Sequence, residues 1–292
     1  MSDQPTSTSK RTQLQRGIII LPSAFTLANL FFGFYAIVAA TRGDVLQAGW
    51  FIILAAVLDL LDGRIARFTR TGSTFGGELD SLVDAISFGV APAFIMYTLY
   101  FSDANWSWTL PLAYVMAVVV RLARFNVEQG GEAKVQFHGL PSTTAGMILA
   151  AYYPFSQTPL FQEYLVGMPW PRIMGVVTIL LSALMLSHVP YAVMPKISFK
   201  TRKGVLTTTW MFGNMLAAIM IPRYYFFPML VLYAAWGLTR SVIAGLLERL
   251  PDRDPLLDVE IPEEADEVRT LDYGDLTPER FNRDAQHPEN HN

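Results

Sequence analysis

The sequence contains no cysteine, only four histidines and few charged residues, which make up 16% of its 292 positions. Without cysteine, disulfide bonds and thiolate metal sites are excluded, so a metal ion would have to be held by oxygen atoms or by histidine. Hydrophobic residues, in contrast, make up 52% of the chain, which is more than an average soluble domain contains. The composition therefore favours a membrane protein.

The hydrophobic residues form blocks that approach the roughly 20 residues that a helix needs to span a bilayer. We predict an all-α, polytopic membrane bundle of about eight transmembrane helices, at residues 25–41, 45–67, 79–101, 106–125, 140–154, 173–193, 207–221 and 224–250. The predicted domains are an N-terminal segment at residues 1–20, a membrane domain at residues 21–250 and a tail at residues 251–292.

Basic residues are distributed unevenly between the predicted connections. With both termini in the cytoplasm, the cytoplasmic side receives most of the lysines and arginines, whereas the opposite connections carry Arg42, Arg172 and Arg223. The positive-inside rule therefore predicts an even number of spans and two cytoplasmic termini. Because these basic residues lie beside apolar segments, we interpret them as topology signals and expect no binding of nucleic acid.

The C-terminal tail differs in charge from the rest of the chain. Residues 251–292 hold 13 acidic residues and four arginines, and residues 1–250 hold the other 12 acidic and 18 basic residues. With five prolines and few large apolar residues, the tail is predicted to be disordered and cytoplasmic. A solvated tail and a docking segment for a partner are both compatible with this composition.

Four aspartates interrupt the second and third apolar segments: Asp59, Asp62, Asp80 and Asp84. A carboxylate at membrane depth costs a few kcal/mol, so each should face a polar cavity and have a partner. The first two are three positions apart and the last two are four apart, which puts each pair on one face of a helix. An antiparallel hairpin would bring both pairs together at its cytoplasmic end.

Clustered carboxylates cannot all stay ionised without cations, and hard oxygen ligands favour Mg²⁺ or Mn²⁺, with two ions as the natural count. The residues between the acids suit a phosphate group. Gly63 leaves room for a diphosphate, Ala66 keeps the next turn narrow, and Arg67 offers a forked donor to phosphate oxygens. Gly76 is expected to let the connection turn back toward the third segment.

The pattern Asp59-x2-Asp62-Gly63-x2-Ala66-Arg67-x8-Gly76-x3-Asp80-x3-Asp84 resembles the signature of the CDP-alcohol phosphatidyltransferase family at every fixed position. The resemblance implies a six-helix catalytic core, a homodimer and divalent metal bound by all four aspartates. It also implies that Asp80 and Asp84 are catalytic, with Asp84 as general base, and that the CDP-lipid is contacted by Gly63, Arg67 and Ser73.

Three further stretches resemble the membrane-embedded phosphatidylserine synthases of bacteria and archaea: residues 25–36, residues 78–94, and the motifs RLARFN and GLPS at residues 121–126 and 139–142. They imply that the phosphatidyl group of CDP-diacylglycerol is transferred to L-serine, giving phosphatidylserine and CMP in phospholipid biosynthesis. The enzyme is then expected in the cell membrane, as a multi-pass protein with its active site facing the cytoplasm. Glycerol 3-phosphate, inositol phosphate or choline are the alternative acceptors, and a cation transporter is a remote alternative.

The acceptor site has three candidates at the cytoplasmic end of the fourth segment. Arg121 and Arg124 are three positions apart and could bind the carboxylate of serine, with Asn126 adding a hydrogen bond. The alternative is that the arginines only anchor the helix at the membrane interface. Asn29, inside the first segment, either lines the cytidine pocket, as the resemblance implies, or forms a hydrogen bond between helices.

Overall fold

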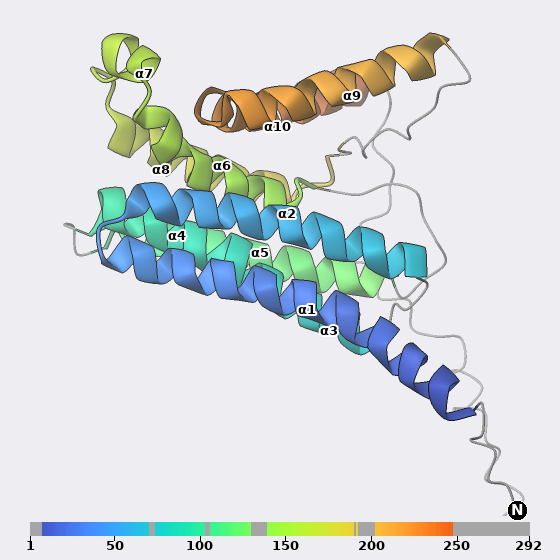
Figure 1. Ribbon diagram of the computed structural model, residues 1–292. Helices are drawn as coiled ribbons and strands as arrows, with labels where there is room; N and C mark the ends of the chain where they lie inside the picture. The colour runs from blue at the N-terminus through green and yellow to red at the C-terminus, as the bar shows by residue number, and fades with distance from the viewer. Residues whose placement is uncertain are drawn as a thin grey trace, which may run out of the picture. The chain divides into compact units, whose positions relative to one another are not determined.

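The computed structural model describes residues 8–69, 74–102, 106–129, 139–189, 191 and 202–247, and every regular element in these ranges is a helix (Figure 1). The chain divides into two units, Met1–Ala244 and Gly245–Asn292. The helices are α1 (Thr8–Thr41), α2 (Val45–Thr69), α3 (Thr74–Asp84), α4 (Ala91–Met96), α5 (Thr109–Gln129), α6 (Ser142–Ser156), α7 (Pro159–Tyr164), α8 (Trp170–Leu186), α9 (Arg202–Met220) and α10 (Pro222–Leu247). The predicted all-α fold is confirmed.

Two π-helical stretches, η1 (Ala85–Val90) and η2 (Tyr97–Phe101), join α3 and α4 into one continuous helical run. The residues at the junctions all keep right-handed helical backbone angles. The run therefore passes from the polar Thr74 end to the apolar Phe101 end without a break, and η1 begins directly after Asp84.

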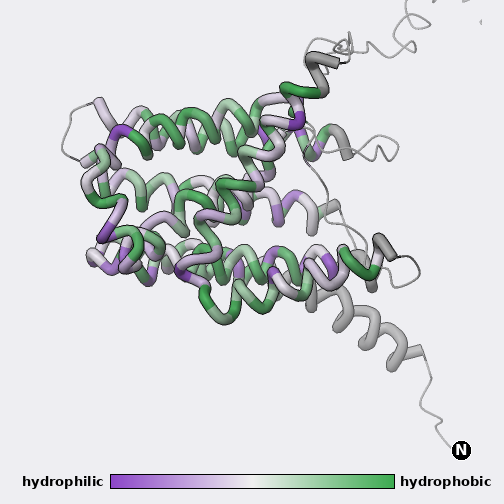
Figure 2. The backbone as a smooth tube through the Cα atoms, turned by 90° about the horizontal axis from the view of Figure 1, so that it is seen from above, coloured by the Kyte–Doolittle hydropathy of each residue, from purple (hydrophilic) through white to green (hydrophobic). Residues whose placement is uncertain are grey.

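Five stretches in the described residues are long and apolar enough to cross a membrane: Ala24–Thr41, Val45–Ile65, Phe75–Phe101, Thr109–Val127 and Pro222–Ile243. Trp170–Leu186 and Gly204–Met220 are apolar but shorter, and α6 has 15 residues. Figure 2 shows apolar residues distributed along these helices, as lipid-facing and core-facing positions both require. The described part of each of the eight predicted segments lies mostly in helix, and residues 190, 192–193 and 248–250 lie outside the described residues. The count of eight spans and the cytoplasmic termini stay predictions.

The short helix α7 was not predicted from the apolar pattern. It begins at Pro159, and the side chain of Thr158 accepts a hydrogen bond from the backbone N–H of Phe161, as an N-cap residue does. Its buried Phe161 packs between Tyr152 and Trp170. A helix of six residues is too short to leave a periodic signal in the sequence.

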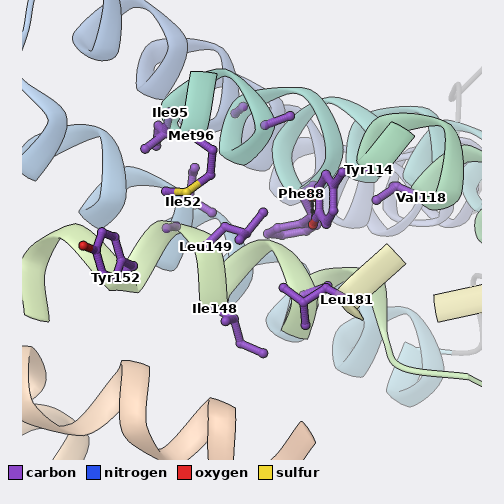
Figure 3. Close-up of a cluster of buried hydrophobic side chains, with 14 of the residues drawn as sticks. Ile52, Phe88, Ile95, Met96, Tyr114, Val118, Ile148, Leu149, Tyr152 and Leu181 are labelled. Atoms are coloured by element: carbon purple, nitrogen blue, oxygen red, sulfur yellow. Dashed lines mark hydrogen bonds between the residues drawn. The ribbon is translucent and has the colours of Figure 1, made fainter. Parts of the chain in front are cut away.

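The buried core lies between α2, the α3–α4 run, α5 and α6. Figure 3 shows Ile52, Phe88, Tyr114 and Leu149, one from each of these four parts, pointing toward one another. The hydroxyl of Tyr114 donates a hydrogen bond of 2.8 Å to the backbone carbonyl of Phe88 within η1. This bond gives a partner to a backbone oxygen at a place where the helical winding is irregular.

Small residues allow the neighbouring helices to approach the α3–α4 run closely. A β-carbon placed on Gly33 of α1 would lie 2.2 Å from Ser87 Oγ, and one on Gly146 of α6 would lie 2.8 Å from the carbonyl oxygen of Phe88. The hydroxyl of Ser87 also donates to the backbone oxygen of Asn29 at 3.2 Å. Close contacts between small residues replace the hydrophobic effect as the packing force within a membrane, so the turn after Asp84 is held from both sides.

The start of α6 is tied to the end of α8. Gly139 has a φ of +82°, and its N–H donates to the carbonyl of Val189 at 2.9 Å. The N–H of Leu140 donates to the carbonyl of Leu184 at 3.0 Å. A side chain at Gly139 would be strained by the positive φ and would lie 2.5 Å from the carbonyl oxygen of Met185. The glycine thus fixes where α6 begins, next to α5 and the aspartates.

Candidate active site

Three of the four predicted carboxylates meet between α2 and α3. Asp59 and Asp62 lie in the last turns of α2, and Asp80 lies in α3. Each offers one carboxylate oxygen, and these three oxygens lie within 4.8 Å of one another. The helix α1 packs against both α2 and α3, so it holds the two halves of the cluster at this separation.

Asp84 lies one helical turn beyond Asp80 and is only 8% exposed. The side-chain amide of Asn29 donates to its Oδ1 atom at 3.5 Å. Asp84 also interacts electrostatically with the three clustered aspartates and with Arg121. It is therefore part of the same acidic site, although the group of three within 4.8 Å does not include it. Its role as a metal ligand stays a prediction.

Two threonines from outside the hairpin donate hydrogen bonds to the aspartates of α2. Thr26 Oγ1 of α1 donates to Asp62 Oδ2 at 2.8 Å, and Thr143 Oγ1 of α6 donates to Asp59 Oδ2 at 3.4 Å. Such bonds stabilise an ionised carboxylate and restrict its rotation.

The residues present fit a divalent cation. Three carboxylate oxygens gathered within 4.8 Å are the hard ligands that Mg²⁺ or Mn²⁺ takes. In the described part of the chain, the Oδ1 atom of Asp80 is buried and has no hydrogen-bond partner. A buried carboxylate oxygen without a donor is costly, and a bound cation would remove that cost.

The predicted phosphate-binding residues are described only in part. The side chains of Ala66 and Arg67, and the whole of Ser73, lie outside the described residues. A β-carbon on Gly63 would meet no protein atom within 4 Å, so packing in the described residues does not explain this glycine. Gly76 lies in the first turn of α3 and not in the connection, because the helix starts at the polar Thr74, before the apolar pattern that was used to place it.

The two candidate arginines for the acceptor site have different partners. Arg121 NH1 donates to the buried hydroxyl of Ser142 at 2.8 Å, and the guanidinium lies 5.7 Å from the ring centre of Phe125. Arg124 donates to the carbonyls of Leu186 and Ser187 at the end of α8, at 3.3 and 3.4 Å. Arg121 also interacts electrostatically with Asp84.

Asn126, the third acceptor candidate, connects α5 to α3. Its amide N–H donates to Glu78 Oε2 at 3.3 Å, and its oxygen accepts from the hydroxyl of Ser81 at 3.0 Å. Ser81 follows Asp80 directly, so Asn126 lies near the cluster. Its contact with a substrate stays a prediction.

Sequence reasoning missed the polar residues that contact the aspartates, Arg121 and Asn126: Thr26, Ser81, Ser142 and Thr143. A signal was available for two of them, because Ser142 belongs to the GLPS motif and Thr143 follows it. Thr26 lies three positions before Asn29, on the same face of α1. Single hydroxyls in apolar segments hardly change hydropathy, so only the contacts across helices identify them.

The fold and site define a class of protein: a polytopic, all-helical membrane protein with an aspartate cluster at the end of a helical hairpin. The sequence pattern of the CDP-alcohol phosphatidyltransferase family matches residues 19–184. The chain belongs to this family, and the predicted resemblance is confirmed.

Relatives from distant organisms carry the name CDP-diacylglycerol–serine O-phosphatidyltransferase. The relative from Helicobacter pylori (strain J99) is 30% identical over 190 residues, which cover 65% of this chain and 78% of the relative. The relative from Methanocaldococcus jannaschii is 29% identical over 228 residues, covering 78% of this chain and 96% of the relative. The relative from Mycobacterium bovis is 44% identical over 110 residues, which cover 38% of each chain.

Proposed function

We propose that this protein transfers the phosphatidyl group of CDP-diacylglycerol to the hydroxyl of L-serine, giving phosphatidylserine and CMP in phospholipid biosynthesis. The observation that carries the proposal is the group of Asp59, Asp62 and Asp80, whose carboxylate oxygens lie within 4.8 Å of one another inside the family's sequence pattern. The names of the relatives support serine as the acceptor.

The four aspartates are proposed to hold two divalent cations, Mg²⁺ or Mn²⁺. When bound, these ions would neutralise the diphosphate and the developing charge on CMP. Gly63 leaves open space beside the cluster, and Arg67 is proposed to donate to a phosphate of the CDP-lipid, together with Ser73. Gly63 is thus proposed to let the nucleotide approach the backbone of α2 next to Asp62, its neighbour in the chain.

Asp84 is proposed as the general base. The serine hydroxyl oxygen forms a bond to the lipid-side phosphorus, its proton passes to the Asp84 carboxylate, and the bond between that phosphorus and the CMP oxygen breaks with its electron pair leaving on CMP. Arg121, which interacts with Asp84, is proposed to bind the serine carboxylate. Because Arg124 donates to the carbonyls of Leu186 and Ser187 at the end of α8, the serine carboxylate is assigned to Arg121.

The proposed setting is the cell membrane, with the aspartates at the cytoplasmic boundary and the acyl chains of the substrate between helices. The homodimer implied by the family resemblance and the six-helix catalytic core are part of the proposal, whereas the tail predicted at residues 251–292 lies outside the described residues.

The deciding experiment measures CMP release from CDP-diacylglycerol with L-serine, glycerol 3-phosphate, inositol phosphate or choline in turn, using the purified protein in detergent micelles. We expect release with serine, loss of release after chelation, and recovery with Mg²⁺ or Mn²⁺. A preference for glycerol 3-phosphate would overturn the serine assignment. Normal CMP release by Asp84→Asn would overturn the assignment of the base, and metal uptake into vesicles without CMP release would support a transporter.

A further inference from the structure

The two aspartates of α2 are each contacted by a threonine from a different neighbouring helix. Thr26 of α1 reaches Asp62 at 2.8 Å, and Thr143 of α6 reaches Asp59 at 3.4 Å. Both bonds go to the Oδ2 atom of the carboxylate. The same kind of contact is thus made twice, once from α1 and once from α6, although the threonines are 117 positions apart in the chain.

Thr26 is buried, so its hydroxyl needs a hydrogen-bond partner within the protein. It is 5% exposed and belongs to a stretch long and apolar enough to span a membrane. Thr178 of α8 shows how a buried threonine is satisfied locally, because its hydroxyl donates to the carbonyl of Met174 one turn earlier. Thr26 and Thr143 bond to a carboxylate on another helix, so their hydroxyls link the acidic cluster to the surrounding bundle.

A hydroxyl suits this task chemically. It donates one hydrogen bond to an ionised carboxylate and so restricts its rotation, but it carries no charge that would compete with a metal ion. A lysine or arginine at the same place would neutralise the ligand. Outer partners of this kind orient metal ligands in many proteins, and their loss typically lowers metal affinity by about 10- to 100-fold.

We propose that Thr26 and Thr143 are positioning residues that hold Asp62 and Asp59 in the orientation that binds divalent metal. The inference rests on the metal site of the proposed function and adds the residues that shape it. The helices α1 and α6, which pack on α2, thereby take part in metal binding without supplying a ligand. The shorter bond of Thr26 predicts that its removal has the larger effect.

The test measures Mn²⁺ binding directly, by electron paramagnetic resonance titration of the purified full-length protein without any lipid substrate. We expect Thr26→Val to weaken Mn²⁺ binding by about tenfold or more and Thr143→Val to weaken it less. Thr26→Ser and Thr143→Ser should recover most of the affinity, because they keep the hydroxyl. Thr178→Val is the matched control for the loss of a buried threonine hydroxyl, and it should bind Mn²⁺ like the wild type.

Wild-type Mn²⁺ affinity in both valine variants would overturn the inference, as would equal losses in the valine and serine variants. If Thr26→Val does not fold, the half-buried Thr143 still decides the outcome with its own valine and serine pair. Asp59→Asn and Asp62→Asn separate this inference from the proposed function. Normal Mn²⁺ binding in these two variants would mean that the metal site itself is wrong, whereas a loss in the asparagine variants alone would refute only the role of the threonines.

Discussion

The side-chain amide of Asn29 donates a hydrogen bond of 3.5 Å to the carboxylate of Asp84 and so connects α1 to α3. Asn29 is wholly buried, and its backbone oxygen also accepts from the hydroxyl of Ser87. The sequence allows two roles for Asn29, a hydrogen bond between helices or a contact with cytidine. The bond to Asp84 is a hydrogen bond between helices. A contact with cytidine stays a prediction.

Replacing Asn29 with leucine should lower kcat more than it raises the KM for CDP-diacylglycerol. The substitution removes a donor from a buried carboxylate, and a hydrogen bond to a charged group contributes about 1.5–3 kcal/mol. Because the bond is long, we expect the lower end, a fall in kcat of about tenfold. Steady-state CMP release measures both constants. A rise in KM with unchanged kcat would instead favour the cytidine contact.

Gly63→Ala should leave the fold intact and impair substrate binding. The added methyl group would meet no atom of the described residues within 4 Å, so the melting temperature should not fall. If the diphosphate approaches the helix here, the KM for CDP-diacylglycerol should rise by about tenfold, equivalent to ~1.4 kcal/mol. Gly77→Ala in α3, whose added methyl group would also meet no atom of the described residues within 4 Å, is the control and should neither lower the melting temperature nor raise the KM. If the two variants had the same KM for CDP-diacylglycerol, Gly63 would not be a binding residue of the site.

Arg121 and Arg124 of α5 should have different roles, the first in binding serine and the second in stabilising the fold. Arg121→Gln is expected to raise the KM for serine by about 10- to 100-fold, the range of a lost charge-assisted hydrogen bond of 1.5–3 kcal/mol. Arg124→Gln should leave this KM unchanged and lower the melting temperature, because the carbonyls of Leu186 and Ser187 lose a donor. Kinetics at varied serine and thermal melting in detergent test both statements. Similar serine KM values in the two variants would contradict the assignment.

Gly146→Ala should destabilise the protein, because the new β-carbon would lie 2.8 Å from the carbonyl oxygen of Phe88 and 2.9 Å from its α-carbon. Backbone atoms cannot rotate away, so an overpacking cost of about 1–3 kcal/mol is expected. Gly213→Ala in α9 is the control, since its β-carbon would meet no atom within 4 Å and alanine favours a helix. Thermal melting of both variants measures the difference, and equal melting temperatures would refute the tight contact.

Much of the bundle follows from the sequence, because long apolar blocks in a membrane protein have few structures open to them. The aspartate spacing likewise predicts the meeting of Asp59, Asp62 and Asp80, since period and chain direction determine which faces converge. Asp84 shows the limit of this reasoning. Its spacing of four from Asp80 puts it on the same face, but its partner Asn29 comes from a helix 55 positions away.

Other features depend on contacts that spacing does not encode. Arg121 and Arg124 share one helical face, yet one meets Ser142 and the other the end of α8. Thr26 and Thr143 resemble ordinary threonines in apolar segments until α1 and α6 are packed against α2. The start of α3 was placed too late because polar residues at a helix end carry no hydropathy signal, although they continue the helix.

The π-helical stretch η1 changes how the two ends of the α3–α4 run are rotated relative to each other about the helix axis. In a regular α-helix each residue advances by about 100°, and a π-turn takes up an additional residue. The side chains of Asp80 and Asp84 at the acidic end therefore leave the helix in a different direction, relative to Ile95 and Met96 at the apolar end, than they would in a regular α-helix. If the same residues of η1 were wound as a regular α-helix, the extra residue would rotate one end by about 100° relative to the other, so η1 sets the rotation between the acidic end and the apolar end of the run.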